Sequence, residues 1–276
     1  MKMPEHTAHR ICSGTWQISE FNLVNFFLAE GDDKAAVIDT GCGLGNARSA
    51  VMRLTDKPLS VLLTHTHFDH MGGIYRFTDC PVFMKSDEEG RHTFSLGTGK
   101  PFLKYYVETR AAVLMKGMEA EILSLIPEEE TDVPFSFSEL DDGEIIDLGG
   151  RTLECIAVPG HTAGSMCFLD RKERLLFSGD CVNRSVILPR QQDGSMRIVE
   201  QYHDSLMKLM NREKEFEALA IGHNGPLEDK SLIRDYITLS EGLLDGSIRG
   251  EYMEKGFRKG EAASYGNAEL WYHCDQ

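Results

Sequence analysis

Three histidines and an aspartate, His65, His67, Asp69 and His70, fall within a stretch of six residues. They follow 59–64, a largely apolar run that predicts a strand covered on both faces. His65 and His67 are two apart in an extended segment, so both can point the same way. Asp69 and His70 begin a predicted helix and can point to a second centre. Imidazoles and carboxylates in this arrangement are ligands for divalent metals.

The alternative interpretation is that these histidines are ordinary surface or core residues, as a lone histidine usually is. Crowded at one strand end, protonated imidazoles would repel one another, and buried neutral imidazoles would lack hydrogen-bond partners. A bound cation removes both difficulties. The cluster therefore predicts a metal site at the carboxyl end of the strand, where open α/β sheets place their ligand sites.

The segment T-H-T-H-F-D-H-M-G-G resembles the H-x-H-x-D-H signature of the metallo-β-lactamase superfamily, and the companion motifs follow in order. They are Asp39 in V-I-D-T-G, His161 in P-G-H-T-A-G-S, Asp180 in F-S-G-D and His223 in I-G-H-N-G-P. The last three residues each stand where a predicted strand gives way to a loop. That shared position would bring distant residues to one edge of the sheets.

The resemblance implies a binuclear metal centre. It assigns His65, His67 and His161 to the first metal, Asp69, His70 and His223 to the second, and Asp180 to a bridging position. It also suggests that Asp39 accepts a hydrogen bond from a ligand imidazole, the alternative being a plain turn aspartate. Five imidazoles and two carboxylates without a thiolate suit two Zn²⁺ ions, and would also accept iron, manganese or cobalt.

This ligand set predicts a metal-dependent hydrolase in which a bridging hydroxide attacks an ester, thioester, lactone or phosphodiester. The resemblance also assigns Asp69 to orienting the nucleophile and transferring protons. Glyoxalase II and lactonases are similar, although the 53 residues after His223 are few for the glutathione-binding domain of glyoxalase II. β-Lactamase activity is disfavoured, because those enzymes generally lack the bridging aspartate.

Two other classes of function stay open. Iron-dependent sulfur dioxygenases share the H-x-H-x-D-H frame, but they use one iron and oxygen. Other redox enzymes on the same fold, the flavodiiron oxidoreductases, usually carry glutamate where this chain has His67. A regulatory or scaffold protein could bind metal without turnover. Metal content and oxygen uptake separate the first class from a hydrolase, and a broad substrate panel addresses the second.

The order of predicted elements indicates an α/β (α+β) fold, a four-layer αβ/βα sandwich of the metallo-β-lactamase type in one domain over 1–276. Residues 22–38 predict a hairpin that turns at Gly31, and 46–54 predict a helix. Another strand is expected at 81–84. Between 91 and 135 the strand rhythm breaks and apolar residues recur near the helical period, which predicts an inserted helical cap over the metals.

The strand pattern returns over 144–179 in four short apolar runs. A helix near 201–211, a strand near 217–221 and a helix near 228–244 follow. Residues 251–276 are then a C-terminal extension to the domain.

Composition limits the partners of the chain. Its 29 basic and 44 acidic residues give a formal net charge of −15, which disfavours nucleic acid.

No stretch approaches the roughly 20 apolar residues that span a bilayer, and the first residues lack the apolar block of a secretory signal, so we expect a cytoplasmic protein. Seven scattered cysteines without a C-x-x-C pair fit a reducing compartment. The expected partner is a small anionic or carbonyl-containing molecule, and the oligomeric state is left open.

Several neighbouring residues are not assigned to the site. Cys181 follows Asp180, but neighbours at a strand end point to opposite sides, so a packed thiol is expected. Thr162 and Ser165 either support the loop of His161 or make ordinary turn contacts. Tyr202 could border the pocket, and so could His203. Solvated or locally bonded positions are expected for the remaining histidines: His6, His9, His92, His203 and His273.

Overall fold

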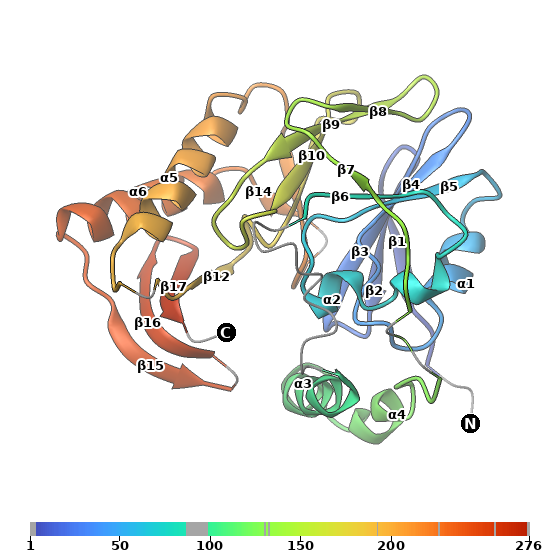
Figure 1. Ribbon diagram of the computed structural model, residues 1–276, viewed down its shortest axis with the longest axis horizontal. Coiled ribbons are helices and arrows are strands. Elements are labelled where there is room, and N and C mark those ends of the chain that lie inside the picture. Colours follow the sequence, from blue (N-terminus) through green and yellow to red (C-terminus); the bar gives the residue numbers. More distant parts are fainter. Residues whose placement is uncertain are drawn as a thin grey trace.

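Three β-sheets form the framework of the protein, and the computed structural model describes residues 4–86, 99–129, 131, 133–191, 193–225, 227–256 and 258–274 (Figure 1). The first sheet has seven strands, which lie side by side in chain order. Strands β1 to β4 pair antiparallel, and the pairs from β4 to β7 are parallel. The strands are β1 (Thr7–Cys12), β2 (Thr15–Glu20), β3 (Val24–Glu30), β4 (Ala35–Ile38), β5 (Leu59–Leu62), β6 (Val82–Met84) and β7 (Ser138–Glu139).

The second sheet has six strands in the order β14-β13-β11-β10-β9-β8, and the third has four in the order β12-β17-β16-β15. Only the pairs β11–β13 and β12–β17 are parallel in the described part of these two sheets. The second sheet contains β8 (Ile145–Asp147), β9 (Thr152–Ala157), β10 (Met166–Asp170), β11 (Leu175–Gly179), β13 (Ala218–Ile221) and β14 (Glu228–Asp229). The third contains β12 (Ser185–Pro189), β15 (Glu251–Lys255), β16 (Arg258–Tyr265) and β17 (Ala268–Cys274).

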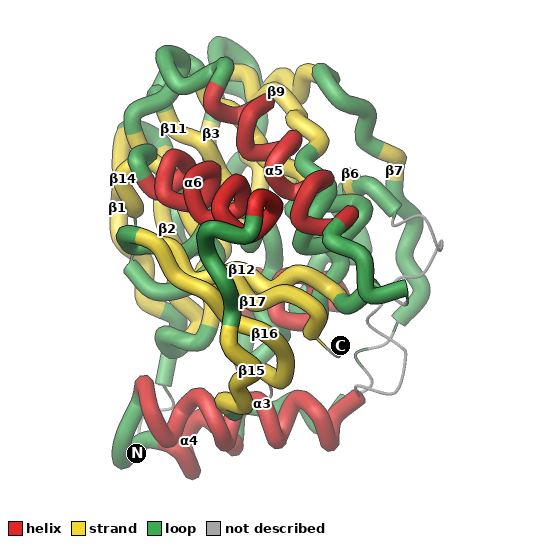
Figure 2. Tube along the Cα trace, turned by 90° about the vertical axis from the view of Figure 1, so that its left-hand side faces the viewer, coloured by secondary structure: helices red, strands yellow, loops and turns green. Residues whose placement is uncertain are grey.

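The described part of the chain also contains six α-helices and one short 3₁₀ turn. They are α1 (Ala47–Met52), α2 (Phe68–Met71), the 3₁₀ turn η1 (Ile74–Arg76), α3 (Gly99–Leu114), α4 (Glu119–Leu123), α5 (Arg197–Met210) and α6 (Leu232–Asp245). α1 and α2 pack on the first sheet, and α5 and α6 pack on the second. The predicted four-layer α/β sandwich is therefore confirmed, with the third sheet packed against α6 (Figure 2).

The hydrophobic core lies on both faces of the second sheet, because successive side chains of a strand point to opposite sides. Phe168 packs in the core between the two sheets, while its neighbour Leu169 packs against the helices. Between the sheets the rings of Phe27 and Phe177 meet edge to face, 5.5 Å between centroids. This apolar contact fixes the two sheets face to face, so that their strand ends lie close together.

The predicted hairpin is present as β3 and β4, but it begins at Val24 rather than at residue 22. Phe21 and Asn22 have positive φ angles of 55° and 58° and form the turn that leads out of β2. The sequence patterns did not predict β1, β2, β7, β12, β14 or the strands in 251–276. The side chains that face out from β15 are exposed, so this strand lacks the apolar run that signals a buried strand.

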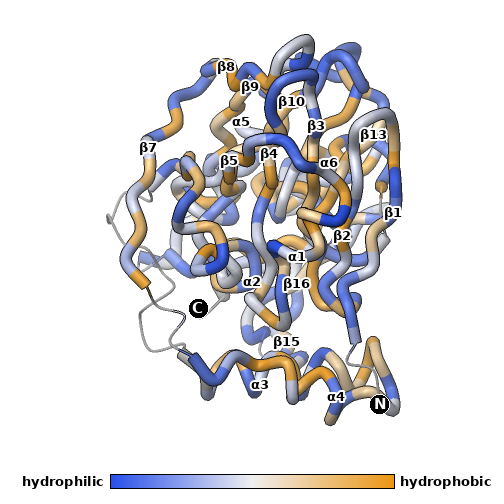
Figure 3. Tube along the Cα trace, turned by 90° about the vertical axis from the view of Figure 1, so that its right-hand side faces the viewer, coloured by the Kyte–Doolittle hydropathy of each residue, from blue (hydrophilic) through white to orange (hydrophobic). Residues whose placement is uncertain are grey.

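The helices α3 and α4 lie within the segment predicted as a helical insertion, of which residues 91–98, 130 and 132 are outside the described part. Tyr106 and Val107 are buried in a small core, whereas Val113 is 72% exposed and Leu114 is 40% exposed. The predicted apolar stripe is therefore buried over only part of its length. Figure 3 shows these two helices below the rest of the chain, with hydrophobic stretches along them.

Two further predictions concern cysteines and membranes. All six cysteines whose side chains are described are free thiols, as expected: Cys12, Cys42, Cys80, Cys155, Cys167 and Cys181. In the described ranges, the helices lack the length and apolar character that a bilayer crossing requires.

A buried ion pair joins the two large sheets where β10 ends. Arg151 donates from Nε to Oδ2 of Asp170 over 2.7 Å, and both side chains are almost fully buried. Its Nη1 also donates to the carbonyl oxygens of Gly14 and Glu30 in the first sheet, at 2.8 and 3.0 Å. Arg151 therefore links backbone turns of one sheet to a carboxylate of the other.

We expect Arg151→Met to lower the free energy of unfolding by about 3–5 kcal/mol, because it leaves the carboxylate of Asp170 buried without a counter-ion. Urea unfolding followed by circular dichroism measures the change. The matched control is Arg197→Met, which removes an exposed ion pair with Asp193 and should cost less than about 1 kcal/mol. Equal unfolding midpoints for the two variants would contradict the structural role of Arg151.

Candidate metal centre

Four strand ends of the two large sheets meet at one edge of the molecule. His65 lies just after β5, His161 after β9, Asp180 after β11 and His223 after β13. Together with α2, this edge brings together all seven side chains singled out in the sequence. Their donor atoms form a first group, His65, His67 and His161, and a second group, Asp69, His70 and His223, and in each group every donor lies within 4.8 Å of the others. His65, His70 and Asp180 form a further set of the same kind that overlaps both groups.

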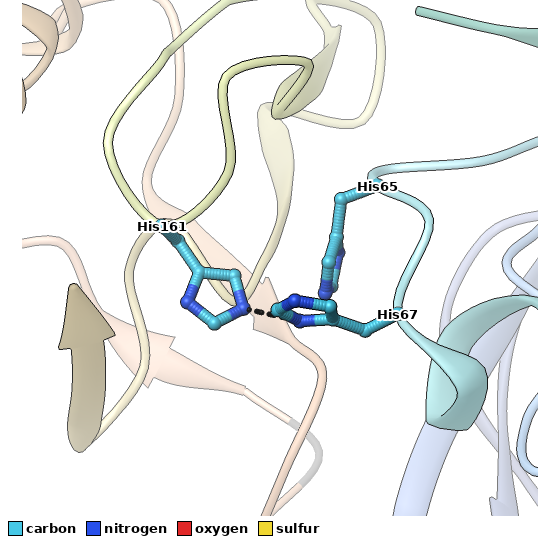
Figure 4. A group of neighbouring side chains, drawn as sticks. All are labelled: His65, His67 and His161. Carbon is cyan, nitrogen blue, oxygen red and sulfur yellow. Dashed lines mark hydrogen bonds between the residues drawn. The ribbon is translucent and has the colours of Figure 1, made fainter. Parts of the chain in front are cut away.

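The first group consists of three imidazoles that face one another (Figure 4). Nδ1 of His67 lies 3.0 Å from Nε2 of His161. The other ring nitrogen of His161, Nδ1, lies 2.7 Å from the carbonyl oxygen of Ile187, to which it donates. His161 thus carries its proton on the outer nitrogen and turns a lone pair toward His67.

The second group mixes two imidazoles with a carboxylate. Nε2 of His223 lies 3.4 Å from Oδ2 of Asp69. Nδ1 of His223 lies 2.9 Å from the carbonyl oxygen of Leu23, which holds the ring in place from behind. His70 completes the group from the same short helix as Asp69.

Asp180 lies between the two groups. Its Oδ1 is 3.4 Å from Nε2 of His70, and its Oδ2 is 3.2 Å from Nε2 of His223 and 3.9 Å from Nε2 of His161. Gly222 allows this approach, because a Cβ atom there would lie 2.6 Å from Oδ1 of Asp180 and from a carbon of His70. One carboxylate therefore touches imidazoles of both groups.

Three donor atoms at the centre have no hydrogen-bond partner although they are buried. They are Nε2 of His65, Nε2 of His70 and Oδ1 of Asp180. An unpaired buried polar atom costs about 1–3 kcal/mol, so three of them facing one space need a compensating ligand. Lone pairs of imidazole and carboxylate groups suit a divalent cation, so the residues present fit a metal ion.

The electrostatics of the first group favour neutral rings. Burial, together with the nearby His161, lowers the pKa of His67 to about 3. Burial also lowers the pKa of His65 well below its ordinary value, and that of His161 more moderately. The three rings are neutral at pH 7 and offer lone pairs. For His70 the effect of burial is outweighed by carboxylates, Asp180 first, which raise its pKa.

Comparison with known families agrees with this geometry. Residues 20–223, well over half of the chain, match the family model described as "Metallo-beta-lactamase superfamily". The chain belongs to the metallo-beta-lactamase superfamily. The resemblance found in the sequence is thereby confirmed.

Curated relatives within the superfamily include the acyl-coenzyme A thioesterase MBLAC2. The Bos taurus protein is 32% identical over 176 residues, which cover 58% of this chain and 59% of that protein. The Gallus gallus protein is 28% identical over 212 residues, covering 66% of this chain and 68% of its own length. The match thus spans about six-tenths of the length of the first relative.

Solved structures in the superfamily share the fold. A metallo-beta-lactamase family protein from Thermus thermophilus superposes with a TM-score of 0.59 at 23% identity, covering 86% of this chain and 82% of that one. At this identity the likeness shows the fold alone.

Asp39 lies behind His70 in this superfamily member. Its Oδ2 is 2.8 Å from Nδ1 of His70, and the carboxylate also accepts hydrogen bonds from the backbone N–H and the hydroxyl of Thr64 at 2.7 and 2.8 Å. A carboxylate in this position keeps the proton on Nδ1 and leaves Nε2 of His70 available toward Asp180.

Two residues of α3 reach the centre, and sequence reasoning did not assign either to it. The hydroxyl of Tyr106 donates to Oδ2 of Asp69 over 3.0 Å. Nη2 of Arg110 donates to the carbonyl oxygen of Leu23 at 3.1 Å and lies 3.4 Å from Nδ1 of His223. Tyr106 and Arg110 are four apart and share one helix face, and this spacing is the signal in the sequence that could have pointed to them.

The residues left out of the predicted ligand set lie as follows. Cys181 is 2% exposed and packs in the core, as expected of a structural thiol. The hydroxyl of Tyr202 donates to the backbone of Cys181, so this ring is a core residue. Nδ1 of His203 lies 3.0 Å from the hydroxyl of Ser240, so this histidine makes its contact between α5 and α6 rather than at the centre.

The other polar residues in question make local contacts. The hydroxyls of Thr162 and Ser165 lie 2.8 Å apart within the turn after His161. Nε2 of His6 lies 3.6 Å from Oε1 of the buried Glu20. The three remaining histidines have separate outcomes: His9 is exposed, His273 is half-buried beside Tyr272, and His92 lies outside the described residues.

We expect Asp39→Asn to weaken the affinity of the centre for a divalent metal ion such as Zn²⁺ about 10- to 100-fold, because an amide cannot hold the Nδ1 proton of His70 as a carboxylate does. Competition with a chromophoric zinc chelator measures the affinity. The control is Asp193→Asn, an exposed aspartate paired with Arg197. An unchanged zinc affinity in Asp39→Asn would show that this carboxylate serves only the turn.

Proposed function

We propose that this protein is a hydrolase whose activity depends on two divalent metal ions, and that it cleaves thioesters. The observation that carries the proposal is the set of three buried, unpartnered donor atoms around Asp180, whose carboxylate lies within 3.9 Å of imidazole nitrogens of both groups. The proposed ligands are His65, His67 and His161 for one ion, Asp69, His70 and His223 for the other, and Asp180 for both.

Zinc is the metal we propose. The donor set contains five imidazoles and two carboxylates, and Cys181, the thiol nearest in sequence, is buried in the core instead. Such borderline donors suit Zn²⁺, and iron or manganese can use the same donors. Metal content is therefore part of the test.

Bound cations would supply Lewis acidity, which polarises a carbonyl oxygen and lowers the pKa of water toward about 7. In thioester hydrolysis the water oxygen bonds to the acyl carbon, the carbon–sulfur bond breaks, and one proton of the water goes to the departing thiolate. Asp69 is the group we assign to carry that proton. Tyr106 donates to one oxygen of Asp69 and keeps the carboxylate in place.

The substrate class is supported by the curated relatives, which carry the name acyl-coenzyme A thioesterase. The chemistry of the site agrees with it, because a thioester offers a carbonyl for polarisation and a good leaving group. We also propose that 91–135 caps the site and influences substrate choice. In its described part, Tyr106 and Arg110 contact Asp69 and His223.

We expect His67→Ala to lower kcat/KM for thioesters by about two orders of magnitude or more while the protein stays folded. Asp180→Asn should do the same, because it removes the carboxylate that contacts both groups. Steady-state kinetics on acetyl-coenzyme A and circular dichroism measure the two properties. His203→Ala is the matched control, because His203 contacts Ser240 away from the centre. Wild-type turnover in His67→Ala would contradict the proposed site.

The class of reaction is tested on protein purified without added metal. We expect about two zinc ions per chain by elemental analysis and release of free thiol from acyl thioesters. Iron in the site together with oxygen uptake on glutathione persulfide would replace the hydrolase by a sulfur dioxygenase. Inactivity toward thioesters, lactones and phosphodiesters with both metals bound would point to a protein without turnover.

A further inference from the structure

Two arginines approach the metal centre from elements far apart in the sequence. Arg110 lies on α3, and Arg258 is the first residue of β16 in the C-terminal sheet. Figures 1 and 2 both show the end of the β15–β16 pair beside α3. The two cationic side chains therefore come from the two parts of the chain that border the centre on this side.

Arg110 is held beside the second group of imidazoles without a carboxylate of its own. Its Nη2 donates to Leu23 and lies 3.4 Å from Nδ1 of His223, and its guanidinium carbon is 5.4 Å from the ring centroid of Tyr106. Among the described residues it forms no ion pair, and its buried Nε has no hydrogen-bond partner. In a chain with 44 acidic residues, this guanidinium keeps its positive charge available to a ligand.

Arg258 is held in a fixed position by the third sheet. Its Nη1 donates to the hydroxyl of Ser185 at 2.5 Å and lies 3.6 Å from Oε1 of Glu269. Its guanidinium carbon is 5.9 Å from the ring centroid of Trp271. The carboxylate of Glu269 is shared, because it also accepts hydrogen bonds from Ser185 and from Nε1 of Trp271.

The third sheet places Arg258 near the centre, because Ser185, which accepts its hydrogen bond, and Ile187, which accepts that of His161, both lie on β12. Burial lowers the pKa of Arg258, and the positive charge of Arg110 lowers it further, whereas Glu269, Asp180 and Tyr106 act in the opposite sense. The charges of Asp180 and of Arg110 thus both act on Arg258. Two like charges held near each other repel, and an anion bound between them is attracted to both, which offsets that repulsion.

Resting on the proposed function, we propose that Arg110 and Arg258 bind an oxyanion group of the substrate, a phosphate or a carboxylate, beside the metal centre. Guanidinium groups match the planar geometry of such anions and form strong charge-assisted hydrogen bonds with them. The anion has two chemical sources in a thioester: the phosphates of a coenzyme A thiol, or a carboxylate at the far end of a dicarboxylic acyl group.

The first experiment measures the affinity for anionic ligands that are not hydrolysed. The chain has two tryptophans, so Trp16→Phe leaves Trp271, next to Arg258, as the sole indole fluorophore. The zinc-loaded protein is titrated with coenzyme A, with pantetheine, which lacks the phosphates, and with succinate. We expect saturable binding of coenzyme A or of succinate, weakened about 10- to 100-fold by Arg258→Gln and by Arg110→Gln.

Matched variants distinguish the loss of positive charge at the proposed anion site from a change in folding or in total charge. Arg249→Gln removes an exposed arginine in the same region of the chain and should leave the affinity unchanged. Arg258→Lys keeps the charge and should recover part of the affinity. Circular dichroism checks the folding of each variant. Absence of binding by either anion, or equal affinities in all variants, would overturn the anion site.

The second experiment divides the effect between KM and kcat. Three thioesters are compared. Acetyl-coenzyme A carries phosphates on its thiol part, succinyl-N-acetylcysteamine carries a carboxylate on its acyl part, and acetyl-N-acetylcysteamine is neutral. Arg258→Gln should raise KM for the anionic substrate about tenfold or more and leave KM for the neutral one unchanged. An equal rise for the neutral substrate would mean that the arginines act structurally, against the proposal. Arginine-dependent binding of coenzyme A without turnover of any thioester would instead refute the proposed function alone.

Discussion

The structure depends on a cluster of polar groups buried together at the edge of two sheets. Nε2 of His65, Nε2 of His70 and Oδ1 of Asp180 face the same space without hydrogen-bond partners. Such atoms destabilise a fold unless something binds them, and here neutral imidazoles and a carboxylate present lone pairs together. The most economical reason for the fold to keep this arrangement is a cation between them.

The protein holds three of the five imidazole rings of the centre by the ring nitrogen that faces away from it. His161 donates to the carbonyl oxygen of Ile187, His223 donates to that of Leu23, and His70 contacts the carboxylate of Asp39. Each contact occupies the outer nitrogen, so the inner nitrogen is the one that faces the centre. These outer partners come from β12, from the turn before β3 and from the end of β4, so the geometry of the site relies on all these parts of the fold.

Most of the framework could be predicted from sequence because burial leaves a local pattern. The apolar runs at β5, β6 and β9 to β11 mark strands, and the hairpin of β3 and β4 is marked by its turn residues. β15 escaped prediction, because an exposed edge strand carries no apolar run. The burial of α3 was predicted only in part. The ring of Tyr106 on α3 packs against Phe68 of α2. Which side chains of α3 are buried therefore depends on where α2 lies, and the local sequence of α3 does not contain that information.

The sequence by itself determined which chemical groups are present and where along each strand they stand, since the H-x-H-x-D-H segment and its companion motifs end predicted strands. Only the tertiary structure decided what surrounds them. Tyr106, Arg110 and Arg258 belong to no local motif. Tyr106 and Arg110 contact Asp69 and His223 from α3, and Arg258 bonds to Ser185 on β12, the strand that also holds His161. Spacing along one strand is a local property of the chain, whereas contact between distant segments exists only once their apolar faces have packed.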